Sequence, residues 1–425
     1  MRFIADFHIH SPYARAVSKQ MTFENLDKWG RIKGIQVLGT GDFTHPKWFK
    51  EIKTKLIPAE NGLYKLNPKF QIPAIVEGVP EVRFILSAEV SSIYSKKGKV
   101  RRIHNLIFFP SVDDVEKFNI LLGLRGNLAS DGRPIVGVGS KELLKMALSV
   151  NPEVLFIPAH AWTPWFSIFG SKSGFDTIEE CFDELTPYIY SIETGISSDP
   201  AMNWRVSQLD NIALISNSDS HSLVRIGREA NIFDTELSYK GIFDAIRYKD
   251  PKKFLSTIEY FPEEGRYHYD GHRACGVSFH PDQSKKTNFL CPHCSKPLTI
   301  GVMARVEELA DRPQGEKPSN AIPFKNMVPL DQIIGDALDL GVASKAVWKE
   351  YDKLIKNIGN EFQVLFESTK EKLASITTGQ ITEAIMRVRD GKLNIEPGYD
   401  GEYGKVQIFV GDERDGFENQ TALPI

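Results

Sequence analysis

Histidines and acidic residues in the first half of the chain have the types and spacing of metal ligands. The opening apolar run, residues 2–7, is followed by His8 and His10. Alternate residues of a strand face the same side, so these two imidazoles are expected to point at one place. Such a pair is also common where a strand merely reaches water. The other histidines and acids of the chain decide between these two interpretations.

Similar side chains accompany six further apolar runs, at 35–38, 82–86, 103–109, 154–157, 188–192 and 213–215. The polar residues in or just after these runs are Asp42, His45, Glu89, His104, His160, Glu193, Asp219 and His221. Any one of them could be a helix cap or a buried polar group, but the same pattern after seven runs indicates a shared metal site. We therefore predict a catalytic metal site in this half.

The elements that must position these residues are strands that alternate with helices. Seven apolar runs, separated by helical segments such as 22–33 and 141–149, predict an α/β fold with a distorted (β/α)7 TIM-like barrel. In such barrels the catalytic residues lie at the carboxyl ends of the strands, which is where the histidines and acids of this chain occur.

A second cluster of metal ligands lies between residues 268 and 294. His272 and Cys275 form an HxxC pair, and Cys291 and Cys294 form a CxxC pair. Two such pairs separated by a loop predict a closed, tetrahedral structural zinc site. The spacing leaves the histidine ligand open, because His268 and His280 are rivals to His272, whereas His293 would strain the CxxC knuckle.

Composition places the chain among multidomain globular proteins. It has 425 residues, 41% of them hydrophobic, and a net charge of −3. This charge argues against a generic nucleic-acid binder, and the basic stretches 47–55 and 96–102 are most simply solvated faces beside His45 and His104. No signal peptide and no apolar run of about 20 residues is visible, so we expect a cytoplasmic protein without membrane association.

The predicted domain organisation follows from these patterns. From about residue 301 apolar residues recur at helical spacing. We expect a barrel at 1–230, a connecting segment at 231–266, a zinc finger at 267–300, an α-helical domain at 301–405 and a polar tail at 406–425. Cys181, alone in a helical stretch, is expected to be a small buried hydrophobe.

The motifs carry a resemblance to a known family. The HxH of the first run, the GTGDFTH turn, the glutamate of SAEV and the closing SDSH resemble the PHP (polymerase and histidinol phosphatase) superfamily of metallo-phosphoesterases. The segments DFHIHSPYARAVSK, GTGDFTHPKW and YHYDGHRACGV are similar to the endonuclease Q family of DNA-repair enzymes, and this likeness runs from residue 1 to about residue 405.

The resemblance implies how the ligands are shared. The first metal would be held by His8, His10, Glu89 and Asp219, which are also the predicted catalytic residues. The second would be held by Glu89, His104 and His160, with Glu89 bridging. A third would draw on Asp42, His45 and His221, although the stretch SPYARAVSK lacks a histidine that the superfamily often supplies. The segment DGHRAC, as part of this resemblance, favours His272 as the histidine ligand of the zinc.

The ligand types indicate which metals and which reaction to expect. Mixed imidazole and carboxylate ligands suit zinc, manganese or iron better than calcium. Two metals about 4 Å apart can activate a hydroxide and stabilise the leaving oxygen of a phosphate ester. We expect Zn²⁺ in the structural site and in the active site, and Mn²⁺ or Mg²⁺ for activity.

The expected substrate is DNA with a damaged base. By resemblance, the enzyme would cut the phosphodiester 5′ of uracil, hypoxanthine, xanthine or an abasic site. An aromatic loop at 161–175 could stack on an extruded base, although it could equally be a hydrophobic lid. The predicted DNA contacts are Trp162, Trp165, Phe166, Gly170, Ser171, Arg15, Lys47 and Arg305, with Lys285, Lys286 and Arg312 as further phosphate contacts.

Two alternatives and one further partner stay open. A small-molecule phosphomonoesterase would use the same metal ligands but leaves the zinc finger and helical region unexplained. A lesion-binding adaptor without catalysis would be expected to have lost ligands that this chain retains. Gln420 and Leu423 resemble a sliding-clamp-binding tail without its aromatic pair, which adds a sliding clamp as a second predicted partner.

Overall fold

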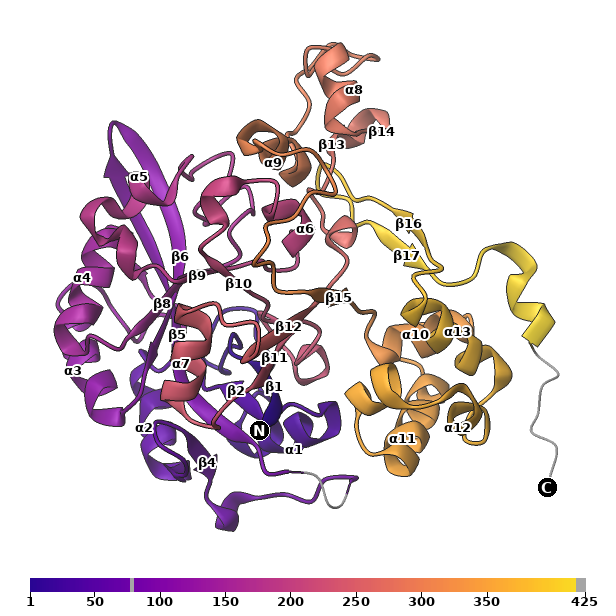
Figure 1. Ribbon diagram of the computed structural model, residues 1–425, viewed down its shortest axis with the longest axis horizontal. Helices are drawn as coiled ribbons and strands as arrows, with labels where there is room; N and C mark the ends of the chain where they lie inside the picture. The colour runs from indigo at the N-terminus through magenta and orange to yellow at the C-terminus, as the bar shows by residue number, and fades with distance from the viewer. Residues whose placement is uncertain (77–79, 418–425) are drawn as a thin grey trace.

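All seven apolar runs of the first half contain strands. The structure, a computed structural model, describes residues 1–76 and 80–417. The strands are β1 (Arg2–Asp6), β2 (Val37–Gly39), β5 (Arg83–Lys96), β6 (Lys99–Phe109), β8 (Leu155–Pro158), β9 (Ser191–Glu193) and β10 (Ala213–Ile215). They belong to a mixed α/β fold built on a large central sheet, except that β9 and β10 form a two-stranded sheet of their own (Figure 1).

Strand direction departs from a regular (β/α)7 repeat at one place. β1, β2 and β5 run parallel, and β9 pairs with β10 in parallel. β6 instead runs antiparallel to both β5 and β8, because Lys97 and Gly98 turn the chain back directly. Both turn residues have positive φ, 52° and 74°, as a two-residue hairpin turn requires. The apolar periodicity alone could not reveal this reversal.

The sheet extends beyond the predicted strands. β11 (Ala230–Asp234) pairs antiparallel with β1, β12 (Phe254–Glu259) pairs antiparallel with β11, and β15 (Phe324–Asn326) pairs in parallel with β12. The segment predicted as a connection thus contributes two strands. Three short strands complete the sheet, β3 (Leu56–Pro58), β4 (Tyr64–Leu66) and β7 (Ile135–Val136).

Helices cover the outer face of this sheet (Figure 1). They are α1 (Phe23–Lys33), α2 (Pro46–Lys55), α3 (Val112–Gly123), α4 (Ser140–Val150), α5 (Ile178–Phe182) and α7 (Tyr239–Arg247). The two helices predicted from the sequence are therefore confirmed as α1 and α4. A second core on the inner side of the sheet packs Phe3, Phe7, Phe108 and Phe233 together, all almost fully buried. This rigid core fixes the strand ends that carry the site.

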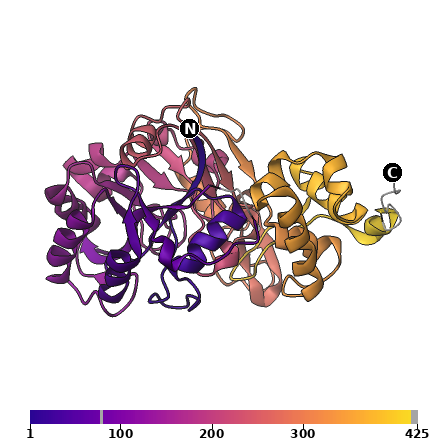
Figure 2. The same cartoon turned by 90° about the horizontal axis from the view of Figure 1, so that it is seen from below.

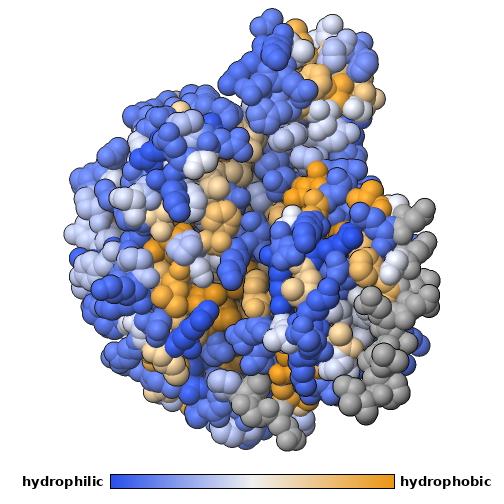
Figure 3. Space-filling view, turned by 45° about the vertical axis from the view of Figure 1, so that its right-hand side comes forward, coloured by the Kyte–Doolittle hydropathy of each residue, from blue (hydrophilic) through white to orange (hydrophobic). Residues whose placement is uncertain are grey.

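A small cysteine-containing module follows the sheet and projects from it (Figure 3). It contains the hairpin of β13 (Asp270–His272) and β14 (Val277–Phe279) and the short helix α8 (Pro281–Lys286). Its own core consists of Val277, Cys291 and Leu298, with Cys275 and Phe279 packed against them. So few apolar side chains cannot stabilise a fold alone, which makes a metal ion the natural source of stability.

The C-terminal helices form a separate mass beside the sheet (Figures 1 and 2). These helices are α10 (Leu330–Ala337), α11 (Lys345–Ile358), α12 (Lys370–Ala374) and α13 (Gly379–Arg389). Other helices and strands not yet named are α6 (Pro200–Asn203), α9 (Val302–Leu309), β16 (Asn394–Glu396) and β17 (Lys405–Gln407). A buried ion pair of 2.6 Å between Lys33 of α1 and Glu361 ties these helices to the sheet-containing part.

Two features of the described residues bear on partners. Within residues 1–76 and 80–417, no helix has the length and apolar character that crossing a membrane requires. Gln420 and Leu423, on which the sliding-clamp prediction depends, lie outside the described residues.

Candidate active site

Two groups of ligand residues meet at one glutamate. Glu89, in the middle of β5, lies 3.3 Å from Nε2 of His8 and 3.2 Å from Nε2 of His10 through its Oε2. Asp219, which follows β10, lies 3.1 Å from Nε2 of His10. The potential ligand atoms of these four residues are all within 4.8 Å of one another. They form the first of the three metal sites that the resemblance implies.

The second group lies on the other oxygen of the same carboxylate. Oε1 of Glu89 is 2.6 Å from Nδ1 of His104 and 3.2 Å from Nε2 of His160. The two imidazole nitrogens are themselves 3.2 Å apart. Glu89 therefore presents one oxygen to each group, which is the geometry of a bridging carboxylate.

The backbone at the site is strained at three residues that follow strands. Asp42, His160 and Asp219 have φ of 46°, 29° and 45°, in the left-handed region that non-glycine residues rarely adopt. Such conformations cost free energy and tend to persist where the function of a site depends on them.

The charges of this cluster call for a cation. Burial alone would raise the pKa of Glu89, but the positive charges of Arg133, His104 and His8 hold it well below its usual value. Burial would lower the pKa of His8, yet Glu193, Asp219 and Glu89 raise it well above 6.5. Among the described residues, Nε2 of His8 is buried without a hydrogen-bond partner. A metal ion would satisfy that nitrogen and the crowded carboxylates together, so these residues fit a metal.

Two of the predicted ligands have a different role in the structure. Asp42 accepts hydrogen bonds from Nδ1 of His10 at 3.0 Å and from the backbone and hydroxyl of Ser11. Glu193 lies 3.1 Å from Nδ1 of His8 and accepts from the backbone N–H of His160. Both carboxylates face the side of the imidazole that points away from the cluster. In these positions they orient the two imidazole rings, and their assignment as direct ligands stays a prediction.

His45 and His221 also lie outside the two groups. The ring of His45 stacks on Tyr13 at 4.6 Å, at the start of α2. The ring of His221 lies 4.7 Å from that of His10, and its Nδ1 is 2.9 Å from the carbonyl oxygen of Asp219. The described residues therefore assemble two of the three predicted sites, and the third stays a prediction.

We expect Glu193→Gln to weaken metal binding without unfolding the protein. Loss of the negative charge behind His8 makes its imidazole a poorer ligand, and such outer carboxylates typically contribute about 10- to 100-fold in metal affinity. Titration of chelated protein with Mn²⁺, followed by calorimetry, would measure the change. Glu179→Gln, a substitution of an exposed glutamate on α5, is the control, and equal affinities for the two variants would contradict the role given to Glu193.

The four residues of the predicted zinc site converge in the projecting module. His272, Cys275, Cys291 and Cys294 place their ligand atoms within 4.8 Å of one another. Desolvation would raise the pKa of the Cys291 thiol, but the backbone N–H groups of His293 and Cys294 lower it to about 6. A thiolate is therefore available at neutral pH, as metal ligation requires.

The two rival histidines lie elsewhere. His280 begins α8, where its Nδ1 accepts a hydrogen bond from the backbone N–H of Asp282. His268 is buried, and burial lowers its pKa to about 4. The structure thus places His272, not His268 or His280, with the cysteines.

His268 leads to a prediction about pH. Between pH 6.5 and about 4 the unfolded chain binds a proton at His268 that the folded chain does not, so the free energy of unfolding falls as pH falls. The 2.5-unit difference corresponds to about 3 kcal/mol. His268→Gln should flatten this part of the pH dependence, measured by urea denaturation at pH 7 and pH 4.5, and should retain zinc. A zinc-free variant would show that His268 is a ligand.

The aromatic loop differs from its prediction at several positions. Trp162 is fully buried against Phe169 and donates a hydrogen bond from Nε1 to Asn203 at 2.7 Å. It therefore cannot stack on a base without unpacking the core. Gly170 lies in a tight buried turn. A Cβ at this position would lie 2.4 Å from the carbonyl oxygen of Thr163. Trp165 is 39% exposed and remains available for stacking.

Two further loop residues remain at or near the surface. Ser171 is exposed. Phe166 packs its ring 4.8 Å from that of His104, directly beside the second ligand group. Both stay predicted DNA contacts.

The predicted phosphate contacts divide into exposed and structural residues. Arg15 and Lys47 are exposed, as are Lys285 and Lys286. Arg305 is buried and donates to the carbonyls of Phe169 and Phe175, and it pairs with Asp176 and Glu308. Arg312 donates to the carbonyl of Trp204 and pairs with Asp210. These donors of Arg305 and Arg312 are used within the protein, and their assignment as phosphate contacts stays a prediction.

Comparison with known proteins decides the family. Residues 329–392 match the family described as the MJ0043 C-terminal domain. The uncharacterized protein MJ0043 of Methanocaldococcus jannaschii is 32% identical over 59% of this chain. The matched part covers only 31% of that relative's length. The crystal structure of the lesion-specific endonuclease PfuEndoQ from Pyrococcus furiosus is 30% identical, with a TM-score of 0.83 and 98% of both chains covered. The chain belongs to the endonuclease Q family. An endonuclease Q structure in complex with a 27-mer duplex carrying an abasic lesion at the active site is 31% identical, with a TM-score of 0.83 over 97% of this chain and 98% of that one.

The geometry of the cluster includes a basic residue that the sequence did not single out. Arg133 donates to Oε2 of Glu89 at 3.0 Å, and Glu89 raises the pKa of Arg133 further above its usual value. Its side chain is 29% exposed, so the guanidinium lies at the rim of the cluster. No spacing in the sequence connects Arg133 with Glu89, because it follows a loop instead of a predicted strand.

A cavity adjoins the same cluster. It has a volume of about 580 Å³ and is lined by residues including Thr163, Tyr260, Glu264 and Tyr267. The hydroxyl of Thr163 lies 3.3 Å from Nδ1 of His160, which places the cavity wall directly beside a ligand. Among the described residues, Oε1 of Glu264 is buried without a hydrogen-bond partner. A space of this size, with polar groups on its wall, can hold a nucleoside.

Proposed function

We propose that this protein is a metal-dependent DNA-repair endonuclease that cuts the phosphodiester 5′ of deaminated bases and abasic sites. The observation that carries the proposal is the Glu89-bridged pair of ligand groups on a chain that matches endonuclease Q structures over almost its whole length. One of those structures holds a lesion-bearing duplex at its active site. Uracil, hypoxanthine and xanthine are the proposed deaminated bases.

The proposed architecture assigns a part to each segment of the chain. Residues 1–230 would form a distorted seven-stranded barrel of the PHP type, and 267–300 a zinc finger. Residues 301–405 would form the helical domain, 231–266 the connection and 406–425 a polar tail. The three-cysteine, one-histidine set of the projecting module suits Zn²⁺. The imidazole and carboxylate groups of the active site suit Zn²⁺ or Mn²⁺, and Mg²⁺ is a further candidate for activity.

The roles of the chain's own residues follow from their positions. His8, His10, Glu89 and Asp219 would hold one metal, and Glu89, His104 and His160 the other. When bound, such metals supply a hydroxide nucleophile and stabilise the charge that develops on the leaving oxygen. Asp42 and Glu193 keep the histidine rings in their ligating orientation. Arg133 adds a positive charge at the rim, where it can bind the phosphate of the substrate.

Lesion recognition would take place beside the ligands. Extrusion of the altered nucleoside places the adjacent phosphate on the cluster, and unstacking costs less for a weakly paired base. Trp165, Phe166, Ser171 and the wall of the neighbouring cavity are the proposed contacts. The ring centres of Trp165 and Tyr267 are 5.9 Å apart in an edge-to-face arrangement. Because Tyr267 lines the neighbouring cavity, two aromatic side chains lie beside that cavity.

A cleavage assay tests this proposal. A labelled duplex with one deoxyuridine is incubated with Mn²⁺ or Mg²⁺ beside an undamaged duplex and p-nitrophenyl phosphate. We expect one cut immediately 5′ of the uridine, leaving a 3′-hydroxyl and a 5′-phosphate, and no cut in the undamaged duplex. Turnover of the phosphomonoester alone would instead identify a phosphomonoesterase. Binding of the lesion without any cleavage in saturating Mn²⁺ would identify an adaptor.

A further inference from the structure

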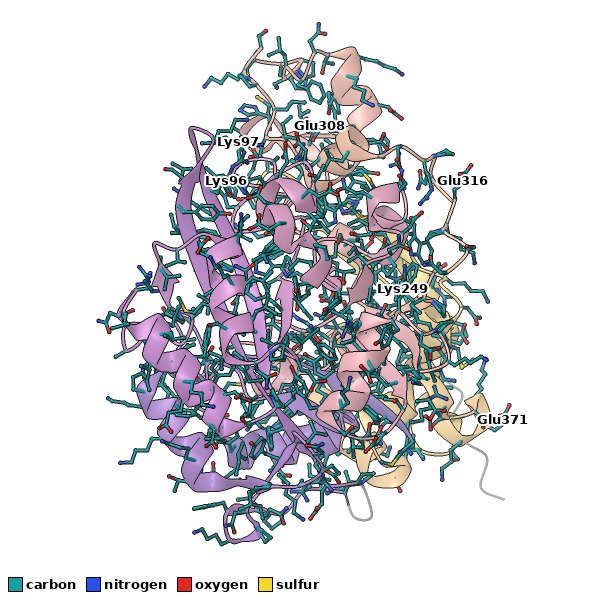
Figure 4. All side chains as sticks on the ribbon, turned by 60° about the vertical axis from the view of Figure 1, so that its left-hand side comes forward. Lys96, Lys97, Lys249, Glu308, Glu316 and Glu371 are labelled. Atoms are coloured by element: carbon teal, nitrogen blue, oxygen red, sulfur yellow. The ribbon has the colours of Figure 1, made fainter. Side chains whose placement is uncertain are left out.

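The β5–β6 hairpin continues well beyond the residues that form the active site. Its strands pair in unbroken register from Leu86 with Phe109 to Lys96 with Lys99. Glu89 and His104 lie in its inner half, and Figure 4 shows the outer half, with Lys96 and Lys97 labelled, projecting from the body. From His104 to Gly98 at the turn is six residues, or about 20 Å of strand. The hairpin therefore connects the ligand cluster to a distant tip.

The cations of this hairpin fall into two kinds. Lys96 is held by Asp183 at 2.9 Å and by the carbonyl of Cys181, and Arg101 is buried beside Phe175 and bonded to the carbonyl of Gly174. Lys96 fastens the hairpin to the end of α5, and Arg101 fastens it to the loop between β8 and α5. They are not available to a partner.

Three further cations of its outer half, Lys97, Lys99 and Arg102, have no acidic partner in the part of the chain that the structure describes. Lys97 and Lys99 are exposed at the tip, and neither forms an ion pair there. Arg102 alternates with His104, so both lie on one face of β6, and its guanidinium lies 5.7 Å from the ring centre of Phe166. Positive charge without an acidic partner thus lies both beside the second ligand group, at Arg102, and at the tip of the hairpin, at Lys97 and Lys99.

The turn of the hairpin has a lysine at a position whose positive φ favours other residue types. Lys97 has φ of 52°, where asparagine, aspartate or glycine is the usual choice in a hairpin turn. The protein as a whole carries a net charge of −3, so this local excess of positive charge is not a consequence of composition. In Figures 1 and 4 the hairpin and the cysteine-containing module, with exposed Lys285 and Lys286, project from the same end of the molecule.

We propose that the β5–β6 hairpin is a phosphate-binding arm that contacts duplex DNA away from the cut, through Arg102 near the cluster and Lys97 and Lys99 at the tip. This inference rests on the proposed function and names how its substrate is held. The partner is the sugar–phosphate backbone, because Lys and Arg side chains without acidic partners supply the sequence-independent positive charge that phosphates bind. At 3.4 Å per base pair, an arm of about 20 Å reaches roughly six base pairs from the cut, on one side only.

The salt dependence of binding tests the arm directly. Each lost phosphate contact lowers the slope of log K against log salt concentration by about 0.9. Lys97→Ala with Lys99→Ala should therefore reduce the slope by about 2 for an undamaged duplex, measured by fluorescence anisotropy in the full-length protein. Lys97→Arg with Lys99→Arg should restore it, since the charge is retained.

The matched control removes two exposed lysines from the opposite end of the sheet. The carbonyl of Lys253 accepts from the backbone N–H of Asp234, which pairs with Arg2 at the start of β1, so Lys252 and Lys253 lie far from the ligand end. Lys252→Ala with Lys253→Ala should leave the slope unchanged. Equal slopes for the hairpin double variant, this control and the parent would overturn the proposal.

The length of the duplex distinguishes a contact from structural damage. The cleavage defect of the hairpin double variant should disappear when one flank of the lesion is cut back to about 3 base pairs, and should persist when the other flank is shortened. A defect that is the same on every duplex would overturn the arm as a distant contact. A parent protein that cleaves no lesion-bearing duplex would overturn the proposed function, whereas the salt slopes would still decide the role of the hairpin.

Discussion

Glu89→Gln is expected to abolish cleavage of lesion-bearing DNA, with a fall in rate of at least about 10³-fold. The substitution keeps the shape of the side chain but removes the charge that both ligand groups share, since each carboxylate oxygen faces one group. Metal ions supply several kcal/mol of transition-state stabilisation in such sites, and each 1.4 kcal/mol is a factor of ten. The rate is measured under single turnover with a deoxyuridine duplex.

Binding and stability measurements complete this prediction. DNA affinity in the absence of added metal should change little, because the DNA contacts proposed at the arm and the loop remain. The control is Ser91→Ala, two residues further along β5 on the same face, where the hydroxyl is buried without a partner in the described residues. Full activity of Glu89→Gln at saturating Mn²⁺ would remove the bridging role of this residue.

Cys291→Ala is expected to release the zinc of the projecting module and to unfold that module. The thiol belongs both to the ligand set and to the small core with Val277 and Leu298, so its loss removes a ligand and apolar contact together. Structural zinc contributes roughly 10–16 kcal/mol in isolated finger peptides at neutral pH, far more than so small a core can replace. Zinc content by mass spectrometry and proteolysis of residues 267–300 measure the two effects.

The other buried cysteine provides a matched comparison. Cys181 is buried between α4 and the β5–β6 hairpin, where Tyr94 contacts its sulfur at 3.7 Å, and it belongs to neither ligand group. Cys181→Ala should keep the zinc and the protease resistance of the module. If Cys291→Ala retains zinc, folds and binds DNA as the parent does but fails to cut, the structural role of the site is wrong.

The sequence was sufficient to find the residues that meet in the cluster, because they lie in or just after five of its apolar runs. His8, His10, Glu89, His104, His160 and Asp219 all meet in the structure. The pattern could not distinguish a carboxylate that faces a metal from one that faces the far nitrogen of a ligand ring. For that reason Asp42 and Glu193 were assigned as ligands, although they accept hydrogen bonds from His10 and His8.

Burial explains the remaining differences. Trp162 was assigned to the DNA because the loop is rich in aromatic residues, but the fold uses that ring as core. Arg305, a charged residue near the start of a helix, would ordinarily be placed at the surface. It is buried because the loop carbonyls of Phe169 and Phe175 accept hydrogen bonds from its guanidinium. Both outcomes depend on contacts more than 35 residues apart, which local sequence patterns do not encode.

The C-terminal helices were found as a group but not in detail. α10, α11 and α13 lie in the region from about residue 301 whose helical spacing predicted a helical domain. Between α11 and α13 the chain is divided into a π-helical segment at Gln363–Glu367 and the short helix α12. The carbonyls of Val364 and Leu365 accept hydrogen bonds from Arg389, a tertiary contact that the periodicity of the segment does not contain.

The most direct test of the central claim is cleavage of a deoxyuridine duplex by protein whose active-site metals have been removed and counted. Chelation under conditions that retain the zinc of the projecting module should stop the cut, and restoring Mn²⁺ to the Glu89 cluster should bring it back at the same position, immediately 5′ of the uridine. The same cut at the parent rate by protein shown to hold no metal at Glu89 would contradict the account.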